Sequence, residues 1–315
     1  MSPQSLGNTL IIANPAAHSG RGEAAAIYVM RFFSSFHSIA SSCSVQLTER
    51  KGDAFRMAED SVEYETVIAL GGDGVVHEVV NGLMKLPEHA RPRLGIIPVG
   101  TGNDFARTLG MSKNDPERAM SELLGGEERE LDLGCVNGTY FVQSLSFGLD
   151  AAIAQDTVRR RSLFGVQHGS SLYLTSGIRM LALDQYGWPY RAVIDGEETL
   201  EGMGVAFAVQ NGKTYGGGFK ICPDAVPNDG LLDLCVSVEK PSRVHALALF
   251  GLIRLGRHVN SKKLLLRQMR HMEVVFIGEE QPPCQVDGEA FLDDHYTIDV
   301  VPHALRVITP PNHKW

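Results

Sequence analysis

Two glycine-rich segments contain the residues of this chain best suited to hold a phosphorylated ligand. Residues 71–74 are Gly-Gly-Asp-Gly after the apolar run 67–70, and residues 100–105 are Gly-Thr-Gly-Asn-Asp-Phe after the run 94–99. Glycine lets the main chain approach an anion closely, because it has no Cβ and accepts positive φ. Asp73 adds a carboxylate, and its repulsion with a bound phosphate would have to be offset by a metal ion or a protonated hydroxyl. The pair of segments indicates a nucleotide with Mg²⁺, whereas one such motif alone fits equally well a turn in which Asp73 caps a helix.

The elements around these segments must bring them together. Both apolar runs are predicted to be strands, and a helix is predicted over 75–86, because Val76, Val79, Val80 and Leu83 recur at the spacing of one buried face. Open parallel sheets bind ligands at the carboxyl ends of their strands, so we expect both loops to face one crevice. His77 and Glu78 then lie beside the first loop.

The first third of the chain alternates strand and helix patterns, which predicts crossover units and a mostly parallel sheet. The expected strands include residues 9–13 and 44–48, and the expected helices are 22–36, 53–59 and, after an Asn114-Asp115 cap, 116–124. Gly125-Gly126 and the charged residues 127–130 indicate a domain boundary.

Beyond residue 130, β-branched and aromatic runs between glycine turns predict an antiparallel sandwich or a related β domain. The expected strands are 139–147, 190–194, 204–209, 231–238, 272–277 and 296–301. Helices are expected near 151–159, 171–183 and 242–258, and a final strand over 304–309 can return to the first domain.

Composition excludes several classes of protein. A chain of 315 residues with 43% hydrophobic and 21% charged residues is typical of a soluble protein with two cores. The net charge of −8 argues against general nucleic-acid binding. The five cysteines show no metal-site or disulfide spacing, and neither a signal peptide nor an apolar run long enough for a transmembrane segment occurs. We therefore expect a cytoplasmic location.

Further motifs follow the same two loops in an order known from one family. They are Asn14-Pro15 with Ser19-Gly20, Thr48 before Gly52-Asp53-Ala54, Gly71 to Gly74 with Glu78, Asn81 and Gly82, Pro98 to Gly110, Gly216 to Gly218, Pro223 to Ala225, Asp229 to Asp233, and Asp287-Gly288-Glu289. Over nearly its whole length the chain resembles lipid kinases of the diacylglycerol kinase superfamily, in particular the soluble bacterial branch.

The resemblance implies a three-layer, Rossmann-like α/β domain of the NAD kinase/diacylglycerol kinase type and a C-terminal β-sandwich-like domain, with the ATP site between them. It places the nucleotide-binding domain at residues 1–130, rejoined by 303–315, and a lipid-binding and catalytic domain at 131–302. The implied activity is ATP-dependent transfer of the γ-phosphate to a hydroxyl of a membrane lipid such as diacylglycerol, as part of phospholipid metabolism.

The resemblance also assigns the nucleotide contacts. ATP is expected to contact Thr48, Thr101 and the stretch Gly71, Gly72, Asp73, Gly74, Val75, Val76 and His77, with Asn14 and Ser19 near its phosphates. Taken by themselves, Thr48 and Thr101 are ordinary turn residues. Val75 departs from the family, which usually has threonine there, so a side-chain hydroxyl that could cap the helix or touch phosphate is missing.

A second set of residues matches the magnesium loop of the family. Asp229 is expected to supply a carboxylate to Mg²⁺, together with the main-chain carbonyls of Val226 and Leu231. An Asp-Gly hairpin turn at Asp229-Gly230 explains the same residues, and both interpretations can hold together.

Glu289 matches the residue that accepts the proton of the lipid hydroxyl, and Asp287 is expected close to the metal network. In sphingosine kinase relatives the base is instead assigned to the position of Asp73, so Asp73 remains the alternative catalytic residue. We favour Glu289.

The location of the acceptor lipid rests on the helix predicted over 242–258. It is apolar almost all round and has a basic end, so it can lie on an anionic bilayer at the inner membrane face or be a buried core helix. The sequence leaves open whether the protein forms a homodimer. It also leaves open which lipid accepts the phosphate: diacylglycerol, a sphingoid base, phosphatidylglycerol or a prenol. The alternatives in other classes are an NAD kinase-like enzyme and, because of Val75, a non-catalytic nucleotide- or lipid-binding regulator.

Overall fold

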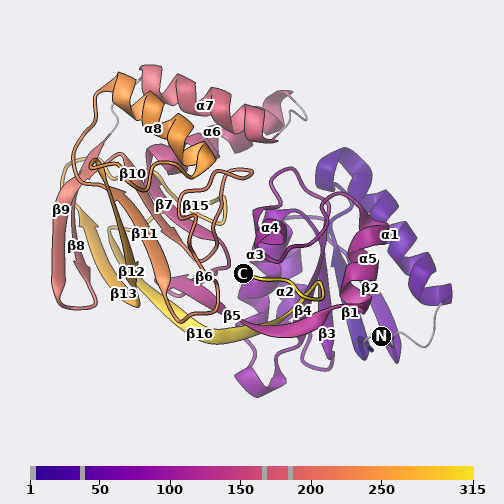
Figure 1. Cartoon of the computed structure of the whole chain (residues 1–315). Coiled ribbons are helices and arrows are strands. Elements are labelled where there is room, and N and C mark those ends of the chain that lie inside the picture. The colour runs from indigo at the N-terminus through magenta and orange to yellow at the C-terminus, as the bar shows by residue number, and fades with distance from the viewer. Residues whose placement is uncertain (1–4, 36–39, 165–168, 184–186) are drawn as a thin grey trace. The chain divides into compact units, whose positions relative to one another are not determined.

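The computed structural model describes residues 5–35, 40–164, 169–183 and 187–315 (Figure 1). It divides into two compact units. Unit 1 consists of Met1–Leu131 with His303–Trp315, and unit 2 consists of Asp132–Pro302.

Unit 1 is built on a parallel sheet in the order β2-β1-β3-β4. Its strands are β1 (Asn8–Ala13), β2 (Ser42–Leu47), β3 (Thr66–Gly71) and β4 (Arg93–Pro98). The end of β16 (His295–Thr309) continues the sheet, because Val307 pairs in parallel with Leu94 of β4. β5 (Glu127–Val136) pairs with β16. All six residues of β3 are buried, as expected for a central strand covered on both faces.

Helices cover both faces of this sheet, which gives unit 1 three layers. The helices are α1 (Ala17–Ser35), α2 (Asp53–Glu59), α3 (Asp73–Leu83), α4 (Asp104–Thr108) and α5 (Pro116–Leu124), with a 3₁₀ turn η1 at Glu88–Ala90. α1 packs with α5, and α2 packs with α3 (Figure 1).

Three helices of unit 1 can be compared with their predicted bounds, and α5 begins at a side-chain cap. α5 starts at the predicted cap, where the Asp115 carboxylate accepts a hydrogen bond from Arg118 N–H at 3.1 Å. α3 starts at Asp73 and ends at Leu83, so the predicted end at residue 86 was three residues too long. α1 contains a non-helical stretch at residues 18–20, and Phe36, its predicted last residue, lies outside the described residues.

Unit 2 is a β-sandwich. A six-stranded antiparallel sheet has the order β12-β11-β10-β7-β14-β15, and the second sheet contains β9, β8, β13 and the first part of β16. The strands are β6 (Thr139–Phe141), β7 (Ser144–Gly148), β8 (Trp188–Ile194), β9 (Glu198–Gly204), β10 (Ala206–Gln210), β11 (Leu232–Ser237), β12 (Leu264–Met269), β13 (His271–Phe276), β14 (Cys284–Val286) and β15 (Glu289–Phe291).

The two sheets share an aromatic core. Phe147 lies at its centre, 5.2 Å from the Phe207 ring and 4.7 Å from the Tyr296 ring, centroid to centroid, with both pairs edge to face. Residues from both sheets thus interdigitate, as two layers of a sandwich must. The predicted fold class, an α/β domain followed by a β-sandwich-like domain, is confirmed.

Three helices cover the outer face of the six-stranded sheet and form a second core with it (Figure 1). They are α6 (Leu149–Phe164), α7 (Gly169–Leu183) and α8 (Arg243–Leu255). α8 buries Leu249, Phe250 and Ile253 but exposes Val244 and Leu255. Among the described residues, no helix is both long enough and apolar enough to cross a bilayer.

Some predicted strand boundaries were wrong for local reasons. The predicted strand 139–147 is two strands, because the main chain of residues 142–143 turns to Asp287 instead of continuing one ladder. The predicted helix 242–258 ends at Leu255, since Gly256 adopts a left-handed φ of 69°. β5, β9, β12 and β15 were not predicted.

Candidate active site

The carboxyl ends of the parallel strands in unit 1 gather the predicted nucleotide loops. The Thr48 N–H donates to the Ala13 carbonyl at 2.9 Å, and the Asn14 N–H donates to the Leu70 carbonyl at 3.0 Å. These bonds place Thr48, Asn14 and the Gly71 loop side by side at one edge of the sheet, where open α/β sheets bind ligands.

The two glycine loops touch each other through their main chains. The Val99 N–H donates to the Gly71 carbonyl at 2.7 Å, and a Cβ added to Gly100 would lie 2.6 Å from Gly72 Cα. No side chain fits at Gly100 without moving the other loop. The glycines that were predicted to leave room for an anion therefore also allow the two loops to lie in contact with each other.

Asp73 bridges the same two loops. It is the first residue of α3, and its Oδ1 accepts a hydrogen bond from the Phe105 N–H at 3.4 Å. A Cβ on Gly102 would lie 2.6 Å from Asp73 Oδ2, so glycine at 102 leaves room for this carboxylate. Asp73 thus lies between the first turn of α3 and the 100–105 loop.

Two cations near Asp73 were not singled out by the sequence analysis. Arg107 forms an ion pair of 3.1 Å with Asp104 and also donates to the Gly102 carbonyl. Burial and then Arg107 lower the pKa of Lys113, whereas Asp104 and Asp73 oppose that shift. The loop therefore carries mixed charge, and no periodic signal in the sequence marks Lys113.

Asn14 and His18 fix the segment after β1. The Asn14 Oδ1 accepts a hydrogen bond from the Ala16 N–H at 2.9 Å, and His18 Nδ1 lies 3.1 Å from the Gly100 carbonyl oxygen. His18 and Ser19 hold left-handed φ angles of 47° and 59°. This strained turn next to a loop that is a candidate for phosphate binding was not visible in the spacing of the residues.

Val75 and Val76 point into the core of unit 1. Val75 is 8% exposed, and a Cβ on Gly71 would lie 2.8 Å from its Cγ2. The contacts predicted for these two positions can therefore come only from their main chains. Thr101 and His77 are half-buried at the two loops.

The loop after β2 is held by Asp53. Its carboxylate accepts hydrogen bonds from the Glu49 and Arg50 N–H groups, both at 2.9 Å, and these bonds lower the pKa of Asp53 to about 2. The Gly52 N–H donates to Glu78 Oε1 of α3 at 2.9 Å. Glu78 and Asp53 thereby fix the loop that carries Thr48.

In unit 2, Asp287-Gly288 forms the two-residue turn between β14 and β15. Val286 pairs with Glu289 across the turn, and the φ angles of Asp287 and Gly288 are 49° and 90°. Positive φ at both central residues is typical of a type I′ hairpin, for which Asp-Gly is a favoured sequence. Glu289 is therefore the first residue of β15, and it is half-buried.

The Asp287 carboxylate binds the main chain of the segment before β7. Its Oδ2 accepts from the Val142 N–H at 2.9 Å, and its Oδ1 accepts from the N–H groups of Gln143 and Ser144 at 3.0 and 2.9 Å. Asp287 is thus a positioning residue within unit 2, and its predicted proximity to a metal stays a prediction.

Gln285 supports the turn from the buried side. The side chain is 2% exposed, donates to Ser146 Oγ at 2.8 Å and accepts from the Gly288 N–H. The main chain beside Glu289 is consequently fixed both by Asp287 and by Gln285, which is the kind of support a positioned proton acceptor needs.

The predicted magnesium residues lie in the loop that leads into β11. Asp229 Oδ1 accepts from the Leu231 N–H at 3.1 Å, and the Gly230 N–H donates to Asp132 Oδ2 at 2.7 Å. Burial raises the pKa of Asp229, and the negative charge of Asp132 raises it further. Burial, and next Asp229, raise the pKa of Asp233 to about 6.

These oxygens suit a hard cation, because neighbouring carboxylates would be relieved by positive charge. In the part of the chain that the structure describes, no group of three His, Cys, Asp or Glu side chains is arranged to hold a metal. A metal here would therefore need main-chain carbonyls as well, as predicted for Val226 and Leu231.

Two family models match consecutive parts of the chain. The model of the diacylglycerol kinase catalytic domain matches residues 8–136, and that of the YegS C-terminal NAD kinase beta sandwich-like domain matches residues 143–309. A diacylglycerol kinase of Bacillus subtilis is 32% identical over 89% of this chain and 88% of its own length. The chain belongs to the diacylglycerol kinase family.

Other members of the family cover a similar share. A probable lipid kinase YegS-like of Enterobacter sp. is 32% identical over 85% of this chain and 86% of its own. The crystal structure of a putative diacylglycerol kinase from Bacillus anthracis has a TM-score of 0.78 at 26% identity, covering 96% of this chain and 97% of that one. Yeast NADH kinase, with a TM-score of 0.57 at 10% identity over 99% of this chain and 86% of its own, shares the fold alone.

Proposed function

We propose that the chain is an ATP-dependent lipid kinase that transfers the γ-phosphate of ATP to a hydroxyl of a membrane lipid such as diacylglycerol. One observation carries the proposal: unit 1 gathers Thr48, Asn14 and both glycine loops at one sheet edge, around Asp73. Membership of a kinase family gives this edge its natural ligand, a nucleotide.

The nucleotide phosphates bind at the first turn of α3. The first N–H groups of a helix have no partner within it, and the helix dipole favours negative charge there. Gly72 and Gly74 keep this turn open to a close approach by phosphate oxygens. Thr48 and Thr101 supply hydroxyls at the rim, and His77 lies one turn further along the helix.

The predicted metal residues, Asp229 with the carbonyls of Val226 and Leu231, hold a structural Mg²⁺ in unit 2. When bound, Mg²⁺ supplies positive charge that offsets the surrounding carboxylates. Asp132 positions the loop through the Gly230 N–H. In unit 1, Asp73 lies where it can position the metal-bound phosphates of the nucleotide.

Glu289 acts as the proton acceptor for the lipid hydroxyl. Its place next to a type I′ turn, fixed by Asp287 and Gln285, holds the carboxylate on rigid strand backbone rather than on a free loop. Asp287 is less suited to the role, because three main-chain N–H groups already use its oxygens. Asp73 remains the alternative base, as in sphingosine kinase relatives.

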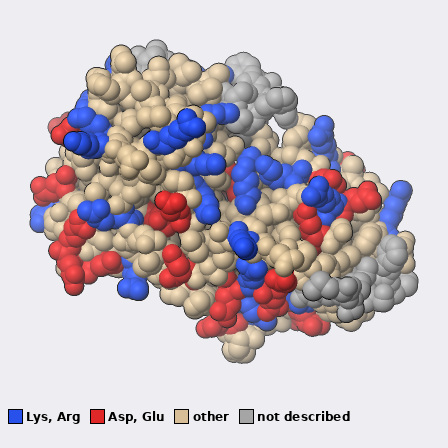
Figure 2. All heavy atoms as spheres, in the orientation of Figure 1, with Lys and Arg blue, Asp and Glu red and all other residues tan. Residues whose placement is uncertain are grey.

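The outer face of α8 docks on an anionic bilayer, which places the enzyme at the inner membrane face. Val244 and Leu255 are 78% and 58% exposed, and Leu247 and Leu252 lie between them in the sequence with more than a third of their surface exposed. Arg243, Arg254 and Arg257 add positive charge at the ends of this helix, and lysines and arginines are visible around it (Figure 2). Exposed apolar side chains flanked by cations are typical of interfacial helices. A homodimer stays a prediction.

The test is transfer from γ-labelled ATP by the full-length protein with Mg²⁺. Diacylglycerol, sphingosine, phosphatidylglycerol and a prenol are offered in mixed micelles, and NAD is offered in solution. Label in a lipid, above all diacylglycerol, supports the proposal. Label in NAD alone would favour the NAD kinase-like alternative, and binding of ATP without any transfer would favour a regulator.

A further inference from the structure

The second glycine loop runs directly into α4, a helix of five residues. A helix this short gains little stability from its own hydrogen bonds, because most of its main-chain groups lack a partner inside the helix. α4 buries Phe105 and Ala106, but apolar contacts have no direction and do not fix the position of a helix along its own axis. The groups that bind the two ends of α4 therefore set the position of the loop.

The first turn of α4 is bound to the candidate nucleotide site. The Phe105 N–H donates to Asp73 Oδ1 at 3.4 Å. The Arg107 guanidinium donates to the Gly102 carbonyl and forms an ion pair of 3.1 Å with Asp104. A displacement of α4 would therefore change the setting of Asp73 and the shape of the 100–105 loop.

The last turn of α4 has four carbonyls that need donors from outside the helix. Three of them accept from N–H groups of the residues that follow: Phe105 from Leu109 at 2.9 Å, Ala106 from Met111 at 2.9 Å, and Arg107 from Gly110 at 3.2 Å. The fourth, the Thr108 carbonyl, lies 2.9 Å from His313 Nε2. A carbonyl can only accept, so this ring nitrogen carries the proton. His313 thereby completes the cap of α4 from a distant part of the chain that belongs to the same unit.

Gly110 leaves room for the His313 ring. Its φ is 71°, and a Cβ at this position would lie 2.4 Å from His313 Nδ1. Any other residue at position 110 would be strained and would displace the imidazole. The glycine that ends the 98–110 segment thus allows the contact between His313 and α4.

The segment that carries His313 is itself held on unit 1. The Thr309 hydroxyl donates to the Glu127 carbonyl at 3.4 Å. The Trp315 ring meets the His313 ring edge to face, with the centroids 5.0 Å apart, and the Arg129 guanidinium lies 5.8 Å from the Trp315 centroid. These contacts hold the imidazole in one orientation, with Nε2 directed at the end of α4.

We propose that His313 is a positioning residue for the nucleotide site. Its Nε2–H caps α4, and this cap holds the Phe105 N–H against Asp73 and keeps the 100–105 loop in contact with the 71–74 loop. The inference rests on the proposed kinase function, since it assigns the consequence to nucleotide binding. His313 touches neither substrate and acts only through α4.

The first experiment measures amide hydrogen exchange of the full chain without ATP. His313→Ala removes the donor, His313→Gln keeps an N–H donor at a similar reach, and Lys314→Ala changes the exposed neighbour as a matched control. We expect His313→Ala to speed exchange across residues 100–110 by about fivefold, the value of one net hydrogen bond, and to leave β1 and β3 unchanged. His313→Gln should restore the protection, and Lys314→Ala should not alter it.

The second experiment measures nucleotide binding by calorimetry and the kinetics of transfer to diacylglycerol. His313→Ala should raise the Kd and the KM for ATP by about fivefold, while kcat at saturating ATP and the KM for diacylglycerol stay within about twofold. His313→Gln should recover the wild-type values. A general loss of stability would instead lower kcat through the amount of active enzyme and leave the KM for ATP unchanged.

The outcomes separate this inference from the proposed function. Equal exchange of residues 100–110 in His313→Ala and Lys314→Ala, or an unchanged KM for ATP in His313→Ala, would overturn the positioning role and leave the kinase function standing. Local loosening and weaker ATP binding in His313→Ala, both restored in His313→Gln, would support the positioning role even if the wild-type protein transferred no phosphate. The absence of transfer would then overturn the kinase alone.

Discussion

The carboxylate of Asp287 accepts three consecutive main-chain N–H groups, and Glu289 follows it by two residues across a type I′ turn. The sequence shows two acidic residues flanking a glycine and cannot separate their roles. The partners of Asp287 lie more than 140 residues earlier in the chain, so its positioning role is visible only in the folded structure. The turn itself, by contrast, could be predicted from Asp-Gly alone.

Asp287→Ala should therefore destabilise the protein more than it affects nucleotide binding. Three N–H groups lose a charged acceptor, and we expect a loss of about 2–4 kcal/mol in the free energy of unfolding. Urea denaturation measures this loss, with Asp294→Ala, an exposed carboxylate near the same hairpin, as the control. Equal stability of the two variants would show that the three hydrogen bonds contribute little.

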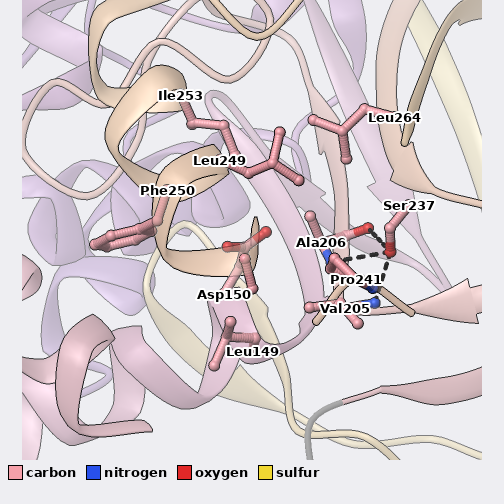
Figure 3. Close-up of a pocket in the computed structure, with 11 residues that line it drawn as sticks. Leu149, Asp150, Val205, Ala206, Ser237, Pro241, Leu249, Phe250, Ile253 and Leu264 are labelled. Carbon is pink, nitrogen blue, oxygen red and sulfur yellow. Dashed lines mark hydrogen bonds between the residues drawn. The ribbon is translucent and has the colours of Figure 1, made fainter. Parts of the chain in front are cut away.

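Asp150 should make stability depend on pH. Its carboxyl lies among Leu149, Leu249 and Phe250 (Figure 3), and burial raises its pKa from 3.8 to about 7 on folding. Its contribution is therefore fully favourable below about pH 4 and is lost as pH rises through 7. Asp150→Asn removes this titration. Relative to wild type, the variant should gain stability between pH 4 and pH 7, by on the order of 4 kcal/mol at about 1.4 kcal/mol per pKa unit.

Denaturant unfolding at about pH 4 and about pH 8 measures that difference, since the other titrating groups are common to both proteins. Parallel pH profiles for wild type and Asp150→Asn would mean that Asp150 titrates in the folded protein as it does in the unfolded chain.

At the scale of elements, periodicity predicted most of unit 1. α2 and α5 have the predicted bounds. Asp115 caps α5, and Asp53, the first residue of α2, holds the loop before that helix by accepting from the Arg50 N–H. β5 was missed because its charged residues are typical of a domain boundary. β12 was missed because its basic residue follows the predicted helix 242–258 and is typical of the basic end of such a helix. β5 exposes alternate charged residues in its first half, a pattern that becomes a strand only by pairing with β16.

The helix predicted over 242–258 had two interpretations, a buried core helix or a helix on a bilayer. α8 has both a buried face, with Ala246, Leu249 and Ile253, and an exposed apolar face, with Val244 and Leu255. Sequence reasoning could not separate the faces, because apolar residues occupy nearly the whole circumference of the helix.

Binding to bilayers tests the outer face of α8. Replacing both Val244 and Leu255 with glutamate should lower the affinity for vesicles containing phosphatidylglycerol by at least about tenfold, through lost apolar burial and added repulsion. Val62→Glu, at a residue that is 56% exposed in unit 1, is the matched control. Sedimentation with the same vesicles decides the matter, and unchanged binding of the double variant would exclude α8 as the membrane contact.

For the whole molecule, the fold class followed from the change of pattern near residue 130. The two units carry different parts of the proposed reaction: the nucleotide loops belong to unit 1, and the Asp229 loop and the Asp287-Gly288 hairpin belong to unit 2. The sequence predicted that both glycine loops face one crevice. It could not predict that Gly72 and Gly100 touch or that Asp73 accepts from the Phe105 N–H, because these contacts join segments about 30 residues apart. The roles of the site residues stay predictions.

Metal should stabilise unit 2 even without nucleotide. A site in the Asp229 loop predicts that Mg²⁺ at about 100 times its Kd adds about 2.7 kcal/mol to the free energy of unfolding. Asp229→Ala should remove this gain, while Asp224→Ala, an exposed carboxylate in the same loop, should keep it. If Mg²⁺ raised the free energy of unfolding equally in wild type and Asp229→Ala, the loop would be a turn that does not bind the metal.

The central claim, phosphate transfer to a lipid hydroxyl with Glu289 as the proton acceptor, is tested most directly by one variant with two readouts. Glu289→Gln keeps the size of the side chain and removes its basicity, so label transfer from ATP to diacylglycerol should fall by about 10²–10⁴-fold. The ATP affinity measured by calorimetry should stay that of wild type, because the nucleotide loops belong to unit 1. Near-normal transfer by Glu289→Gln, together with loss of transfer but unchanged ATP binding in Asp73→Asn, would contradict the account and make Asp73 the base.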